Sequence, residues 1–371
     1  MRLGGSATAT GTDRYRRRFA RVLPHEHFRQ SQTLWLSSIG LGTYLGDYDD
    51  ATDRRYEEAI VAAVESGCNV IDTAVNYRLQ RSERSVARAL NELAAKGFGR
   101  DELVIATKGG FIPYDGVPPS DPRSYFEQTF ARPGVATLSD VVAGCHCMTP
   151  GYLLHQLDCS LRNLDLERID IYFVHNPETQ LGAVSREEFN RRLLKAFEAL
   201  EEAAAAGKIS MYGTATWDGY RTARSSQGYL SLAEVVKLAA QAGGRDHHFK
   251  VIQLPVNLGM TEALTLPNQE INGKPATTLQ AAEALGLTVM CSASILQGQL
   301  SRNLPSLIAE AFPNLETDSQ RAIQFVRSTP GVTTALVGMK ERVHVEENLR
   351  TARVAPSSWE QYSRLFRTAE T

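Results

Sequence analysis

The sequence has no long apolar run, little net charge and few cysteines. No stretch approaches the roughly 20 apolar residues that a membrane-spanning helix needs, so we expect no membrane partner. The 40 basic and 42 acidic residues give a net charge of −2, which excludes a general electrostatic attraction to nucleic acid. The sequence begins without an apolar signal core, and this favours a protein of the reducing cytoplasm.

The five cysteines indicate neither a disulfide framework nor a metal site. Cys68, Cys159 and Cys291 lie in apolar settings that are typical of small core residues. Cys145-His146-Cys147 is the one candidate metal cluster. It lacks a second ligand pair at a zinc-like spacing, so we interpret it as loop packing and expect no metal.

The first 30 residues are polar and basic, with arginines at 14, 16, 17, 18 and 21. A nucleic-acid arm or a transit peptide is the less favoured interpretation, because so short a cluster is a weak signal. We expect a segment that is weakly ordered or packed across the bottom of the following domain.

From residue 31 onward, short apolar runs alternate with helical patterns, many of which end at glycine. This alternation predicts a parallel sheet with covering helices in one α/β domain, residues 31–371. Eight strands favour a closed (β/α)8 barrel, a TIM barrel, from about Ile39 to Ala352. The predicted strands are 39–43, 69–72, 103–108, 169–175, 208–216, 251–256, 288–291 and 334–337, and helices at 343–352 and 357–368 close the chain.

Residues 109–149 interrupt this rhythm after the third strand. Glycine, proline and serine are scattered there among Phe111, Tyr114, Tyr125, Phe126 and Phe130. So long a connection in a compact domain is usually functional, and it leaves the end of a strand. We therefore predict a lid-like insertion over the barrel mouth, with a subunit contact as the alternative.

Three successive predicted strands end on chemically active side chains: Asp72, Lys108 and His175, with Tyr77 just beyond the first. In a parallel barrel all these ends open on one face. Each residue alone has an ordinary interpretation as a cap, a packing group or a solvated strand end. Four together on one face indicate a catalytic site.

In this order and strand context, Asp72, Tyr77, Lys108 and His175 resemble the catalytic tetrad of the aldo-keto reductases. The resemblance extends from roughly Ile39 to Leu349. It implies reduction of a carbonyl group, with Tyr77 as the proton donor. A nearby ammonium lowers a phenol's pKa, and Asp72 would hold Lys108 in place for this role. A neutral His175 would orient the substrate oxygen.

The resemblance also implies a nicotinamide cofactor. Gly42 and Thr43 match the family's Gly-X-Gly-Thr, and Gln253 matches the glutamine that holds the carboxamide. Two departures stand nearby: Ala215 precedes Thr216 where the family has serine and asparagine, and Ser292 replaces a tyrosine that stacks on the nicotinamide. The resemblance also implies pyrophosphate contacts by Ile295, Gln297 and Gly298. It implies adenosine-phosphate contacts by Lys340, Arg342, His344, Glu347 and Asn348.

The function that follows is an NADP(H)-dependent oxidoreductase, with NAD(H) less favoured because Lys340 can meet the 2′-phosphate. Its partner would be a small carbonyl compound or sugar, held by Tyr44, Phe111 and Tyr114, and a homo-oligomer is left open. Two alternatives remain. One is a cofactor-binding barrel with a regulatory or assembly role, and the other is a Schiff-base enzyme that uses Lys108.

Overall fold

Eight parallel strands close into a barrel in the computed structural model, which describes residues 2–366. Their order around the barrel is β11-β12-β3-β4-β5-β6-β7-β8, with β8 paired to β11. The predicted (β/α)8 barrel is confirmed. The strands are β3 (Ile39–Gly42), β4 (Val70–Asp72), β5 (Val104–Gly109), β6 (Ile169–His175), β7 (Ile209–Ala215), β8 (Phe249–Pro255), β11 (Thr288–Ser292) and β12 (Thr334–Gly338).

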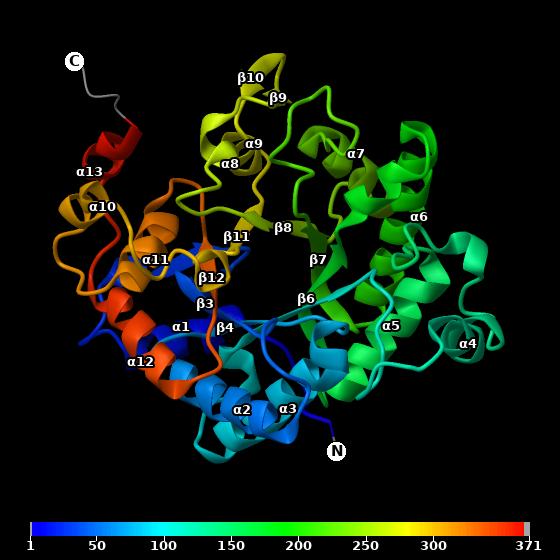
Figure 1. Cartoon of the computed structure of the whole chain (residues 1–371), viewed down its shortest axis with the longest axis horizontal. Coiled ribbons are helices and arrows are strands. Elements are labelled where there is room, and N and C mark those ends of the chain that lie inside the picture. Colours follow the sequence, from blue (N-terminus) through cyan, green and yellow to red (C-terminus); the bar gives the residue numbers. More distant parts are fainter. Residues whose placement is uncertain (1, 367–371) are drawn as a thin grey trace.

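Helices surround this barrel (Figure 1). Several begin where the sequence supplies a cap: Asp49 accepts from the Thr52 amide, and Thr149 stands directly before Pro150. The Asp49 cap thus places the start of α2 at Asp50. The covering helices are α2 (Asp50–Glu65), α3 (Arg81–Ala95), α5 (Pro150–Asn163), α6 (Arg186–Ala205), α7 (Leu232–Gly243), α9 (Thr278–Ala284), α11 (Asp318–Ser328) and α12 (Arg342–Leu349).

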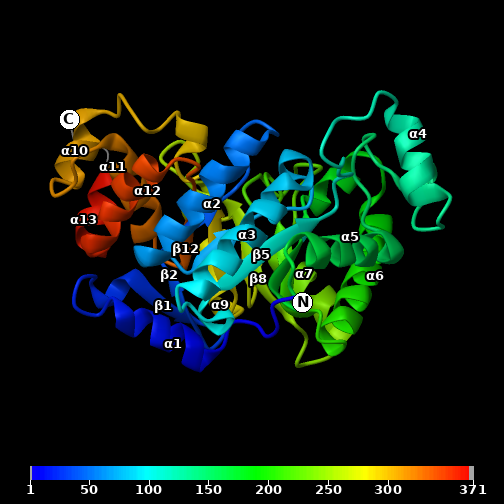
Figure 2. The ribbon, with the colours of Figure 1, turned by 90° about the horizontal axis from the view of Figure 1, so that it is seen from below.

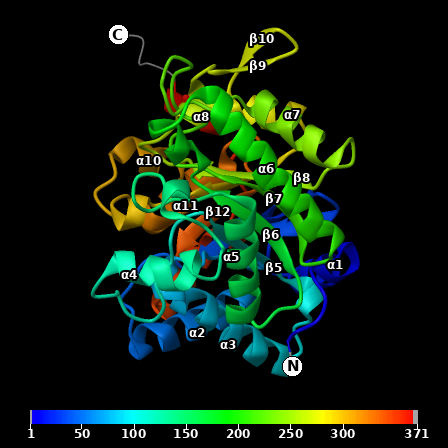
Figure 3. The ribbon, with the colours of Figure 1, turned by 90° about the vertical axis from the view of Figure 1, so that its right-hand side faces the viewer.

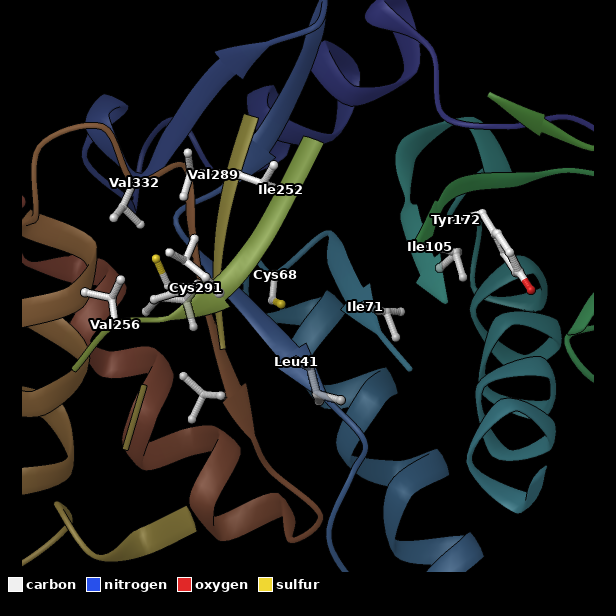
Figure 4. Close-up of a cluster of buried hydrophobic side chains, with 14 of the residues drawn as sticks. Leu41, Cys68, Ile71, Ile105, Tyr172, Ile252, Val256, Val289, Cys291 and Val332 are labelled. Atoms are coloured by element: carbon white, nitrogen blue, oxygen red, sulfur yellow. The ribbon is translucent and has the colours of Figure 1, made fainter. Parts of the chain in front are cut away.

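Side chains of each strand alternate between two cores. Val70 and Val104 belong to the core inside the barrel. Their neighbours Ile71 and Ile105 belong to the core between the strands and the helices (Figure 4). This is the period of two that any strand imposes. Because both faces of a barrel strand are buried, its sequence is a continuous apolar run without visible alternation.

The bottom of the barrel is closed by the hairpin β1 (Phe28–Ser31) and β2 (Leu34–Ser37), with α1 (Ala9–Arg18) beside it (Figure 2). Helix α1 has no clear apolar stripe, and the sequence did not indicate it. It is held by single contacts: the buried Tyr15 donates to the Val64 carbonyl, and Arg14 pairs with Glu102. Part of the basic cluster is therefore engaged in ion pairs within the fold.

The 109–149 segment stands at the periphery, beside α5 and α6, and not across the centre of the barrel (Figures 1 and 3). It contains the short helix α4 (Pro122–Phe126) and a turn of π-helix at Glu127–Ala131. Phe126 and Phe130 are buried in a separate small core with Tyr152 of α5. Most of its aromatic surface is thus used to attach the segment to α5.

The remaining elements are short. They are α8 (Glu262–Thr265), the hairpin β9 (Gln269–Ile271) and β10 (Lys274–Ala276), α10 (Ser306–Ala311) and α13 (Trp359–Ser363). Helix α13 is shorter than the helix expected at 357–368, and a 3-10 turn follows at Arg364–Phe366. The last two residues of that expected helix lie outside the described residues.

Candidate active site

The strand ends bring Asp72 and Lys108 into direct contact at the barrel mouth. The Lys108 ammonium donates to Asp72 Oδ2 at 2.6 Å and to the Thr73 carbonyl at 2.8 Å. Lys108 is fully buried and Asp72 is 5% exposed. A charge buried this deeply needs a partner, and each member of the pair provides one for the other.

Tyr77 is held by an unusual backbone turn. The three residues after it, Arg78, Leu79 and Gln80, all have positive φ, at 46°, 57° and 69°. None of these residue types favours that region, so the surrounding contacts must enforce it. Arg78 supplies them: it is buried, pairs with Asp53 at 2.5 Å, and donates to the Asp47 carbonyl.

The Tyr77 phenol is a protonated acid in this setting. Burial raises the pKa of Tyr77 well above its ordinary value of 10, and the Asp72 carboxylate and Tyr44 add to the increase. The Lys108 ammonium lies over the ring face, 4.8 Å from the centroid. From the sequence, this ammonium was predicted to lower the pKa of Tyr77. Here burial and Asp72 prevail, because Lys108 is already paired with that carboxylate.

His175 completes the cluster as a neutral imidazole. Burial lowers its pKa well below 6.5, and the positive Lys108 contributes to the decrease. Its ring meets Tyr77 edge-on at 5.9 Å and Phe111 at 4.9 Å. Its Nδ1 is buried with no hydrogen-bond partner among residues 2–366. The structure therefore brings all four predicted tetrad residues together.

A cavity of about 870 Å³ runs from the tetrad to the start of α12. This volume lies within the range of small-molecule and cofactor sites. Tyr44, Tyr77, Phe111 and His175 line one end. The predicted cofactor residues in its lining are Gly42, Thr43, Thr216, Gln253, Ser292, Ile295, Gln297, Gly298, Lys340, His344, Glu347 and Asn348.

Two lining residues, Thr216 and Asn348, lie toward opposite ends of this cavity. Their side-chain atoms Thr216 Oγ1 and Asn348 Oδ1 are buried without a hydrogen-bond partner among the described residues. Gln253 is different, because its amide donates to Asp72 Oδ1 at 2.8 Å. Ala215 and Ser292 also line the wall, at the place of the two sequence departures.

Besides the fully buried Lys108, two predicted site residues lie outside the cavity lining. Arg342 is exposed and pairs with Glu346 at 2.9 Å, whereas Lys340 lines the cavity. Tyr114 packs edge-on against Tyr125, with ring centroids 5.3 Å apart. Neither position was distinguishable by residue type alone.

Other lining residues were missed. Asn76 precedes Tyr77, Asn176 follows His175, and Trp217 follows Thr216. Each of them is a sequence neighbour of a predicted site residue, and this was the signal that could have identified it. A loop at a strand end can turn either of two neighbouring residues toward the cavity. Ser319 of α11 also lines the cavity, and no pattern in its surroundings indicated this.

The described residues contain no cluster of three histidine, cysteine or acidic side chains that could hold a metal. Within the same residues, no helix is long and apolar enough to cross a membrane. His146 of the Cys-His-Cys run is buried and bonded within the protein.

Residues 38–241, more than half of the chain, match the family model described as the aldo/keto reductase family. The chain belongs to the aldo/keto reductase family. This aldo/keto reductase is 23% identical to a putative voltage-gated potassium channel subunit beta of Schizosaccharomyces pombe, over 85% of each chain. It is 26% identical to an aldo-keto reductase of Mycobacterium avium, but the match spans only 41% of that relative and 45% of this chain.

Solved structures of the family share the fold. An aldo/keto reductase from Klebsiella pneumoniae, in complex with NADP and acetate, superposes with a TM-score of 0.61 at 20% identity, covering 93% of this chain and 97% of that one. The holo form of an aldo-keto reductase from Bacillus halodurans gives 0.60 at 20% identity, over 91% and 95%.

Proposed function

We propose that this chain is an NADP(H)-dependent oxidoreductase that interconverts a carbonyl compound and its alcohol. The observation that carries the proposal is the cluster of Tyr77, His175 and the Lys108–Asp72 pair at one end of a cavity of cofactor size. The cavity extends from these residues to Lys340 and Asn348 at α12, and this extent fits a dinucleotide that reaches both ends.

Each residue of this cluster has a separate proposed role in the reaction. NADPH, when bound, supplies a hydride to the carbonyl carbon. Tyr77 donates its phenolic proton to the carbonyl oxygen, and the Lys108 ammonium over the ring stabilises the phenolate that is left. Neutral His175 orients the oxygen by a hydrogen bond. In the oxidation direction the Tyr77 phenolate accepts the proton back.

The cofactor preference rests on Lys340. It lines the far end of the cavity, where a positive charge favours the 2′-phosphate of NADP(H) over NAD(H). Gln253 and Thr216 remain to hold the carboxamide, because Ala215 offers no side-chain hydrogen bond. Trp217 is 40% exposed in the same wall, so its fluorescence provides a direct signal of nucleotide binding.

Tyr77→Phe tests the proton donor. We expect it to reduce turnover of aldehydes and ketones by about 10²–10⁴-fold while the Kd for NADPH is preserved, since only the hydroxyl is lost. Tyr114→Phe is the matched control, because Tyr114 lies outside the cavity lining, and it should leave turnover unchanged. If Tyr77→Phe retained most of the activity, another group would have to supply the proton.

A second candidate is a cofactor-binding barrel with a regulatory or assembly role and little turnover. The similarity to the Schizosaccharomyces pombe channel subunit along 85% of both chains favours it, as do Ala215 and Ser292. A screen of aldehydes, ketones and aldoses with NADPH separates the two. Nucleotide binding without turnover of any carbonyl would favour the regulatory role.

The Schiff-base alternative is the least supported. Lys108 is fully buried, and two of its three ammonium protons are bonded to Asp72 and to the Thr73 carbonyl. An amine held as a charged donor is a poor nucleophile. Borohydride trapping of a carbonyl compound on Lys108 would reverse this ranking.

A further inference from the structure

The ends of the 109–149 segment return to the active site. Residue Ile112 donates to the Cys145 carbonyl, and Cys147 donates to the Gly110 carbonyl. These bonds form a short antiparallel ladder that extends β5 beyond its last barrel pair, Gly109 with Val174. His146 lies between Cys145 and Cys147 in this ladder and contacts His175 directly.

His146 binds the backbone of His175. Its Nε2 is 2.7 Å from the His175 carbonyl oxygen, and both residues are buried. The β5–β6 pairing has ended one residue earlier, at Val174, so this carbonyl lies just past the ladder. The next residue, Asn176, turns away with φ of 44°. The bond from His146 holds one side of the point where the strand bends, and on the other side the Asn176 amide donates to the Ala215 carbonyl of β7 at 2.6 Å.

A chain of hydrogen bonds that begins at the half-buried Arg192 and continues through the buried Gln180 sets the proton on His146. Arg192 of α6 donates to Gln180 Oε1 at 2.6 Å, and because a guanidinium only donates, this orients the amide. Gln180 Nε2 then faces His146 Nδ1 at 2.9 Å and must be the donor. His146 Nδ1 is therefore the acceptor, and its proton is on Nε2, directed at the His175 carbonyl.

The packing around this bond is tight. The Phe111 ring meets both imidazoles edge-on, with centroids 5.3 Å from His146 and 4.9 Å from His175. A Cβ on Gly110 would lie 2.9 Å from His146 Nε2 and 2.9 Å from the His175 carbonyl oxygen, so any other residue at 110 would disrupt the contact. These contacts leave the His175 ring little freedom.

We propose that His146 is a positioning residue that holds His175 in its catalytic orientation through the His175 carbonyl. The segment at 109–149 then serves as a brace, anchored on α5 by its own small core, that delivers His146 to the active site. This inference rests on the proposed function, since it assigns His175 the task of orienting the substrate oxygen.

The test compares His146→Leu with His146→Gln. Leucine removes the donor, whereas glutamine carries an amide nitrogen near the position of Nε2. We expect His146→Leu to lower kcat by about 10–100-fold, because small misplacements of an orienting group have effects of this size. The Kd for NADPH should stay unchanged, and His146→Gln should recover most of kcat. A purely structural role would instead reduce the folded fraction and affect both quantities.

His155→Leu is the matched control. His155 lies on α5 and packs against Phe130 of the same segment, 5.6 Å between centroids, but does not line the cavity. Its loss should leave kcat at the wild-type value. The ¹⁵N resonances of the His175 ring provide a second readout that needs no turnover, and they should shift in His146→Leu and stay in place in His155→Leu.

Two failures can be told apart. If the wild-type protein turns over no carbonyl, the proposed function fails, while the His175 resonances still report on the brace. If the wild type is active but His146→Leu keeps its kcat within about twofold and its His175 resonances unshifted, the positioning role is overturned. Should His146→Leu not fold, Gln180→Leu, which frees the His146 tautomer, is judged by the same two readouts.

Discussion

Neutralising Asp72 leaves the Lys108 ammonium buried without a counter-charge. The two groups are 2.6 Å apart, Lys108 has no exposed surface, and Asp72 is 5% exposed. In Asp72→Asn the remaining acceptors of Lys108 are the Thr73 carbonyl and a neutral amide. In Lys108→Met the Asp72 carboxylate keeps only the hydrogen bond from Gln253.

Each single substitution should lower the free energy of unfolding by about 3–5 kcal/mol, the usual cost of leaving one member of a buried pair uncompensated. The double variant Asp72→Asn/Lys108→Met should be more stable than either single variant, because no isolated charge stays buried. Catalysis should be lost in all three, since the phenolate of Tyr77 then lacks its cation.

Equilibrium unfolding in urea measures these free energies, with circular dichroism to confirm that each variant starts from the native fold. Arg342→Met with Glu346→Gln is the control, because this ion pair is exposed and its loss should not be measurable. The reasoning would be refuted if the two single losses added in the double variant, or if either single variant were as stable as the wild type.

Three further results are expected. The kcat/KM for reduction should be flat from about pH 6 to 9, because the lowered pKa of His175 keeps it neutral and the raised pKa of Tyr77 keeps it protonated; an inflection near pH 6.5 or 8 would contradict this. Lys340→Met should raise the Kd for NADPH by about 10–100-fold, the effect of losing a charge-assisted hydrogen bond. An equal increase in the Kd for NADH would show that Lys340 does not contact the 2′-phosphate. Phe111→Ala should raise the KM for the carbonyl substrate, whereas Phe126→Ala should cost about 3–5 kcal/mol of stability with an unchanged substrate profile.

The barrel was predictable, and so was the meeting of Asp72, Lys108 and His175 on one face, because an apolar run identifies a buried strand whose last residue lies at the barrel mouth. A strand buried on both faces must be an apolar run, and a charged residue that ends such a run, like Asp72 or Lys108, must be paired at the sheet edge. The left-handed turn at Arg78–Gln80 was not predictable, since arginine, leucine and glutamine do not indicate positive φ. It is enforced by the Arg78–Asp53 ion pair, and α2 supplies this Asp53 from outside the local sequence.

Helix α1 escaped prediction for a related reason. Its stability depends on Tyr15 reaching the Val64 carbonyl and on arginines reaching Asp101 and Glu102, which are partners far away along the chain. A pattern within ten residues cannot reveal them. The position of Arg342, expected to contact the adenosine phosphate together with Lys340, was not predictable for the same kind of reason. Both are cations near one helix start, and only the local geometry places Lys340 in the cavity lining and pairs Arg342 with Glu346.

The 109–149 segment shows how far a sequence can localise a role. Its aromatic residues indicated that the segment packs against something, but the loop sequence does not show which surface it packs against. In the structure Phe126 and Phe130 pack against Tyr152 of α5, outside the barrel mouth. Of its aromatic residues, Phe111 lines the cavity, two positions after the end of β5. His146 reaches the site although it is distant in sequence, because it pairs with Phe111 in the bridge that extends this strand. The residues of the segment that reach the four predicted tetrad residues are therefore Phe111 and His146, near its two ends, which pair with each other directly beyond β5. The middle of the segment stays at the periphery of the barrel.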